Sequence, residues 1–83
     1  MTITELEQHV HFLAGEADRW LRQAEANLKA RDAIDATWSP EYRNLVGEYD
    51  QIINPAMREA CARHLSASRQ LCAAYDAAVA TNA

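Results

Sequence analysis

Apolar or small residues recur along the first third of the chain at alternating steps of three and four. The stripe consists of Ile3, Leu6, Val10, Leu13, Ala17, Trp20 and Ala24. This spacing is a heptad period and predicts one amphipathic helix. Thr4 followed by Glu7 fits a capping box at its start. We therefore expect a helix from about residue 5 to about residue 31, with Leu21 and Leu28 widening its apolar face on one side.

The periodicity fails in residues 32–39, DAIDATWS, where Asp, Thr and Ser cluster, so this segment is the predicted connection. Ser39-Pro40-Glu41 is then a helix start, with Ser as the N-cap and Pro at the first helical position. A second helix is expected over about 40–53. Its inner face is predicted at Tyr42, Leu45, Val46, Tyr49, Ile52 and Ile53.

Asn54-Pro55 interrupts this second helix. Proline in a helix interior costs about 3 kcal/mol and moves the preceding residue away from the α region. Because Asn and Pro also begin helices well, we expect the second helix to end here and a third to run over about 55–80; a kinked continuous helix is the alternative. The stripe expected on the third helix is Met57, Cys61, Leu65, Ser68, Cys72, Tyr75 and Val79, with Leu71 beside it.

The expected fold is therefore all-α. A long N-terminal helix packs against a Pro-broken helix pair, as a three-helix bundle or a helical hairpin, in one domain over residues 1–83. The composition agrees, because the chain has only 2 Gly and 2 Pro and much of its 49% hydrophobic content is alanine, which excludes a many-stranded fold. So short a chain has a thin core and gains from a second subunit or a partner.

Charge and hydropathy exclude several partners. The net charge is −4 and there is no basic run, so direct binding of nucleic acid through its phosphates is not expected. No apolar run is long enough for a membrane span, and the N-terminus has no secretory leader pattern. Cys61 and Cys72 would lie about 16 Å apart on one helix, too far for a disulfide, and free thiols are typical of a cytoplasm.

Metal and catalytic chemistry are also not expected. His9 and His11 are two residues apart and point to opposite sides of a helix, so they cannot share a metal ion. Cys61 and His64 are three apart and could share one, but the sequence offers no further pair of ligands. We predict no cofactor, no metal and no catalytic residue; a small Cys/His metal or thiol protein is a distant alternative.

Two aromatic residues and several carboxylates are candidates for binding a partner. Phe12 is two residues from Val10 and is therefore expected on the side of the helix opposite to the buried stripe, which indicates a contact with another helix, a second subunit or a target. Trp38 is expected to pack on Tyr42 as a hydrophobic staple; the alternative is an exposed interface anchor. The first eighteen residues contain no Lys or Arg and suit a cationic partner. The predicted partner-binding residues are Phe12, Glu5, Glu16, Asp18, Trp38, Glu41, Glu48 and Asp50.

The N-terminal stripe also predicts a homodimer. It spans roughly 30 Å of helix at 1.5 Å per residue, which a short second helix cannot cover, and the third helix has few large aliphatic residues. A second copy would then cover the rest. The predicted dimer-interface residues are Leu6, Val10, Leu13, Trp20, Leu21 and Leu28.

Residues 41–65, EYRNLVGEYDQIINPAMREACARHL, resemble a segment of small phage and prophage proteins, including the Ead-like phage early proteins. The shared features are an aromatic-rich amphipathic stretch, an Asp-x-Ile-Ile run and an Asn-Pro-Ala helix start. Here they are Tyr49, Asp50, Ile52, Ile53, Asn54, Pro55 and Ala56. The chain then departs from that group, because Arg58, Glu59 and Cys61 replace an aliphatic-rich helix. The resemblance implies a phage or mobile-element origin and carries no catalytic residue.

Together these features predict a non-enzymatic interaction protein that acts in the cytoplasm of a host cell. It would bind and block a larger host protein or complex. Among phage proteins of this size, inhibitors of host defence, including anti-CRISPR proteins, are a natural class. The alternative is a helical homodimer with a structural or regulatory role.

Overall fold

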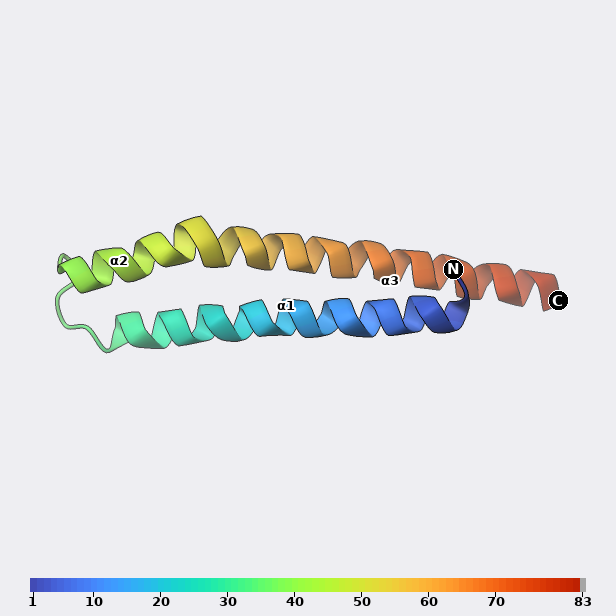
Figure 1. The fold of residues 1–83 in the computed structure, drawn as a ribbon, viewed down its shortest axis with the longest axis horizontal. Coiled ribbons are helices and arrows are strands. Elements are labelled where there is room, and N and C mark those ends of the chain that lie inside the picture. The colour runs from blue at the N-terminus through green and yellow to red at the C-terminus, as the bar shows by residue number, and fades with distance from the viewer. Residues whose placement is uncertain (83) are drawn as a thin grey trace.

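The chain folds into an antiparallel hairpin of two helical arms, as a computed structural model that describes residues 1–82 shows (Figure 1). The first arm is α1, Ile3–Asp32. The second arm consists of α2, Pro40–Glu48, then η1, Tyr49–Ile53, a π-helical turn, and α3, Asn54–Asn82. No strand occurs among the described residues. The all-α prediction is confirmed, and the hairpin is the arrangement that forms.

The start of α1 lies two residues earlier than expected. The Thr2 hydroxyl accepts a hydrogen bond from the backbone N–H of Glu5 at 3.1 Å, and the Glu5 carboxylate accepts one from the backbone N–H of Thr2 at 3.4 Å. The sequence offers two Thr-x-x-Glu frames, and the helix uses the first rather than the one from Thr4 to Glu7. The earlier frame brings Ile3 into the helix at the first position of the heptad stripe.

The second arm stays helical through Pro55, but α2 ends at Glu48 and α3 begins at Asn54, so the Pro-broken pair that the sequence predicts forms as one bent arm with a π-helical turn between its two α-helices. Tyr49 and Asn54 both have right-handed α dihedral angles. The N–H of Asn54 donates to the carbonyl of Tyr49, five residues back. Pro55 cannot donate a hydrogen bond and its ring crowds the carbonyl four residues before it. The wider turn relieves this crowding and bends the arm, as the yellow segment of Figure 1 shows.

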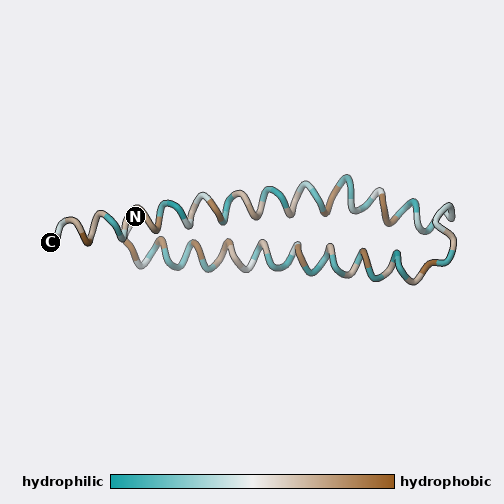
Figure 2. The backbone as a smooth tube through the Cα atoms, turned by 180° about the vertical axis from the view of Figure 1, so that it is seen from behind, coloured by the Kyte–Doolittle hydropathy of each residue, from teal (hydrophilic) through white to brown (hydrophobic). Residues whose placement is uncertain are grey.

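The heptad stripe of α1 faces the second arm, as predicted. Leu6, Leu13, Ala17 and Ala24 are buried, and the other members of the stripe are half-buried. Hydrophobic segments recur turn after turn along both arms (Figure 2). We call the line along which the two arms meet the seam.

On α3 the predicted stripe is wrong by one residue. The residues that line the seam are Ile53, Ala60 and Ala67, which are buried, and Met57, His64, Leu71, Ala74 and Ala78, which are half-buried. Cys61, Leu65, Cys72, Tyr75 and Val79 are exposed instead. Two faces of α3, one residue apart, both have heptad spacing. The face with alanines lies inward because small side chains let the two arms approach closely.

Enlarging the side chain at position 67 tests this close approach, because Ala67 is only 4% exposed. Ala67→Leu should lower the free energy of unfolding by about 1–3 kcal/mol, since the added atoms must push the arms apart. Urea denaturation followed by circular dichroism measures this. Ala73→Leu adds the same atoms at an exposed position of the same helix and should change the value by no more than about 0.5 kcal/mol. Equal stability of the two variants would contradict the alanine seam.

Candidate protein-interaction site

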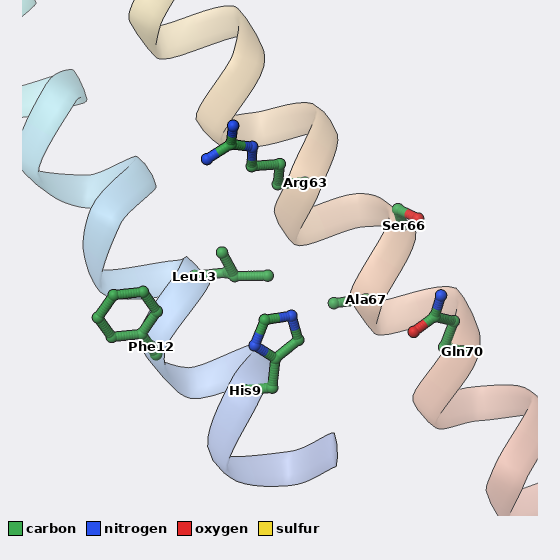
Figure 3. Close-up of a pocket in the computed structure, with 7 residues that line it drawn as sticks. All are labelled: His9, Phe12, Leu13, Arg63, Ser66, Ala67 and Gln70. Atoms are coloured by element: carbon green, nitrogen blue, oxygen red, sulfur yellow. The ribbon is translucent and has the colours of Figure 1, made fainter. Parts of the chain in front are cut away.

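One side of the hairpin has a shallow hollow between α1 and α3 (Figure 3). It is lined by His9, Phe12, Leu13, Arg63, Ser66, Ala67 and Gln70. A second hollow shares Phe12, Leu13 and Arg63 with the first and continues it along the arms. It adds Glu16, Trp20, Ala56, Glu59 and Ala60. We call the two hollows together the central groove.

The heptad geometry explains why these residues meet. Phe12 comes one residue before buried Leu13, and Ser66 comes one residue before buried Ala67. In an antiparallel pair of helices, the flanks that precede the seam residues lie on the same side. Leu13 and Ala67 therefore form the floor of the groove. The small side chains of Ser66 and Ala67 leave the hollow open.

Phe12 is the large apolar side chain of this groove that faces solvent, with 62% of its surface exposed. In Figure 3 its ring lies over α1, away from α3, whereas the His9 ring points into the gap between the helices. The prediction that Phe12 points outward is confirmed. It lies on the flank of the seam rather than diametrically opposite to it, which places it at the edge of the groove.

The rim of the groove carries both signs of charge. An Arg63 guanidinium nitrogen donates to the Glu59 carboxylate at 2.6 Å, one helical turn away. Both side chains are about two-thirds exposed, so this ion pair contributes at most about 1 kcal/mol and can exchange for a partner's charges. Glu16 lies half-buried in the same groove. The groove therefore offers an aromatic ring with an acid and a cation beside it.

The other acidic candidates do not join this groove. The Glu5 carboxylate completes the cap of α1, and the Asp18 carboxylate pairs with Arg22 Nε at 3.0 Å. Glu41 lines a separate hollow near the connection with Ala30, Ala33, Ile34, Asn44 and Leu45. Glu48 and Asp50 are exposed on the second arm. Of the predicted partner-binding set, only Phe12 and Glu16 share one surface.

Trp38 belongs to the opposite end of the molecule. It is 74% exposed in the connection, which favours the interface anchor over the staple. Its expected staple partner, Tyr42, lies instead beneath Arg31, whose guanidinium carbon is 5.4 Å from the ring centre. Twenty residues of helix separate Phe12 from Asp32 at the end of α1, or about 30 Å. Trp38 and Phe12 therefore cannot anchor the same small patch.

A polar layer near the connection was not expected from the sequence. Asn27 is 5% exposed and its side-chain N–H donates to the backbone carbonyl of Leu45 at 2.9 Å. Arg31 lies over the rings of Tyr42 and Tyr49, at 5.4 and 6.0 Å. Asn27 and Arg31 continue the heptad after Ala24 by steps of three and four. The spacing alone could have identified them, but neither residue is apolar.

The predicted dimer-interface residues are mostly engaged within the chain. Leu6 and Leu13 are buried, and Val10 and Trp20 are half-buried, because the second arm is continuous and covers the stripe along its length. Leu21 and Leu28 remain 46% and 47% exposed. The reason given for a second copy on this stripe, a covering helix that is too short, therefore does not hold.

The cysteines and histidines stay apart. Cys61 and Cys72 are exposed free thiols. Among residues 1–82 there is no group of three His, Cys, Asp or Glu side chains placed to hold a metal ion. Within the same range, none of the helices has the length and apolar character needed to cross a bilayer.

The chain matches no protein-family model, and no curated protein or solved structure is significantly similar to it. The resemblance of residues 41–65 to phage early proteins therefore stays a prediction.

On the flank opposite the central groove, Tyr75 of α3 lies across the seam from Glu7 of α1. The pKa of the Tyr75 phenol is raised above its usual value, first by desolvation, then by the neighbouring Glu7 carboxylate and, last, by Cys72. The raised pKa means that the folded chain favours the protonated phenol. This contribution to stability is present below pH 10 and is lost as the pH rises through the raised value.

Glu7→Gln should therefore move the ionisation of Tyr75 back toward that of an ordinary tyrosine, because it removes the charge that opposes the phenolate. Alkaline titration by near-ultraviolet absorbance measures the midpoint, with Tyr75→Phe identifying the signal of this residue. Glu25→Gln, on the same flank of α1, is the matched control and should leave the midpoint unchanged. A Glu7→Gln variant that titrates like the unmodified chain would contradict the contact.

Proposed function

We propose that this chain is a non-enzymatic interaction protein that binds a larger protein of its host cell through the central groove and blocks it. The observation that carries the proposal is Phe12, which is 62% exposed beside a groove built by both arms. An aromatic side chain with a polar surround is typical of the residues that dominate protein interfaces. Arg63 and Glu16 provide that surround.

The proposed host and the proposed class of inhibitor are inferred from sequence features. The resemblance of residues 41–65 to phage early proteins supports a phage or prophage origin. The small size and the net charge of −4 suit an inhibitor of host defence, of which anti-CRISPR proteins are one kind. Two exposed thiols, Cys61 and Cys72, support a reducing compartment such as the host cytoplasm. The partner in this proposal is a protein surface, with no direct contact to nucleic acid.

Phe12→Ala tests the groove directly. The full chain, tagged at one end, is used to capture its partner from a host lysate, and binding to the purified partner is then measured by surface plasmon resonance. Phe12→Ala should speed dissociation and cost about 2 kcal/mol or more in affinity, because the aromatic side chain that the partner would bury is lost. Trp38→Ala is the matched control at the far end of the molecule. If Trp38→Ala weakens binding and Phe12→Ala does not, the site lies at the connection and not in the groove.

Reversing one carboxylate on each flank of α1 tests which flank the partner contacts. Glu16→Lys changes a carboxylate of the groove, so it should slow association and weaken the dependence of binding on salt, since charge steering acts over about 8 Å at physiological ionic strength. Asp18→Lys reverses a carboxylate that pairs with Arg22 on the other flank and should have a smaller effect. Association rates at two salt concentrations provide the comparison. If neither variant changes the association rate, the acidic side chains of the rim do not contribute to binding.

A further inference from the structure

On the flank of α3 away from the central groove, a second row of residues follows heptad spacing. Its members are Cys61, Leu65, Ser68, Cys72, Tyr75 and Val79, at alternating steps of four and three; we call them the α3 strip. None of them is an acidic or basic side chain. Leu65 is 51% exposed, Tyr75 41% and Val79 69%. Leu21 and Leu28 each come one residue after a seam residue of α1, so they lie on the same side of the hairpin as the α3 strip.

The hairpin exposes more surface than a folded chain of its mass normally does. Its accessible surface is 6220 Å², whereas a compact protein of 9.3 kDa exposes about 5,000 Å². The excess, about 1,200 Å², is larger than the ~800 Å² that each partner buries in a standard stable interface. None of the large side chains in the described residues is fully buried. A second layer of helices on the α3 strip would bury part of this excess.

The strip is complementary to itself. Its spacing reads the same in both directions about residue 70, so a two-fold axis there would pair each member with another member of the second copy. Leu65 would meet Tyr75, Cys61 would meet Val79, and Ser68 would meet Cys72. An interface between identical copies around a two-fold axis needs this property. The strip itself carries no acidic or basic side chain, so the two α3 helices can meet along it without pairing like charges; the acidic side chains of this flank, Glu7, Asp18 and Glu25, lie on α1.

We propose that a second copy of this chain packs on the α3 strip, with the two α3 helices antiparallel, and that the pair forms a four-helix bundle. This interface differs from one built on the N-terminal stripe, which the second arm already covers. The central groove lies on the opposite flank and stays free in the dimer. The assembly would then carry two copies of Phe12 facing outward, which strengthens binding to a partner that presents two sites.

Sedimentation equilibrium on the full chain tests the assembly. The unmodified protein should sediment at twice the chain mass of 9.3 kDa at micromolar concentration. Leu65→Glu places a charge within the strip, opposite Tyr75 of the second copy, and should return the mass to that of one chain. Phe12→Glu, at a somewhat more exposed apolar position on the other flank, should remain a dimer. A single-chain mass for the unmodified protein at high micromolar concentration, or equal dissociation by both variants, would overturn the proposal.

Cysteine pairing tests the register without disturbing the fold. In the proposed dimer, Ser68→Cys places a thiol opposite Cys72 of the second copy. Treatment with oxidised glutathione should join the two sulfurs, with two thiols losing their protons and two electrons while the reagent is reduced to two glutathione thiols. A non-reducing gel should then show a covalent dimer. Ser66→Cys, on the groove flank of the same helix, is the matched control and should remain at the level of the unmodified chain. Equal cross-linking of both variants, or none in Ser68→Cys, overturns the proposal.

Discussion

A hairpin of two helices has a single seam, and this constraint governs the rest of the structure. Each helix can turn only about two of every seven residues toward one neighbour. The chain has more apolar residues than the seam can hold. The apolar residues that do not lie in the seam therefore remain exposed on the flanks. Ala17, Ala24, Ala60 and Ala67 take much of the buried space. Their small size brings the arms together and leaves larger side chains, such as Phe12 and Leu65, on the two flanks.

A seam of alanines gives little resistance to sliding, because one small residue resembles the next. The polar layer near the connection supplies the missing specificity. Asn27 donates its hydrogen bond to the Leu45 carbonyl, and sliding one arm along the other would break this contact. The layer has a cost, since Asn27 Oδ1 and Arg31 Nε are buried without a hydrogen-bond partner in the described part of the chain. A single polar residue at a core position fixes register in coiled coils in the same way.

The N-terminal stripe could be predicted because only one face of that helix has apolar residues at heptad spacing. The face of α3 could not, because two neighbouring faces have the same spacing and hydrophobicity favours the one with Leu65 and Tyr75. Choosing between them requires the distance between the arms, which depends on both helices. The outward position of Phe12 follows from α1 alone. Its neighbours Arg63 and Gln70 come from the other arm, and the sequence gives no pairing between the arms.

The shape of the hairpin has a consequence for how the molecule moves in solution. Its extents are 63 × 17 × 16 Å and its radius of gyration is 18.5 Å, against about 12 Å for a compact domain of this length. A rod of this form meets more friction than a sphere of equal mass. It tumbles anisotropically and elutes early from a sizing column. Apparent sizes calibrated on spherical standards therefore overstate the mass of this chain, and elongation of one copy can imitate the association of two.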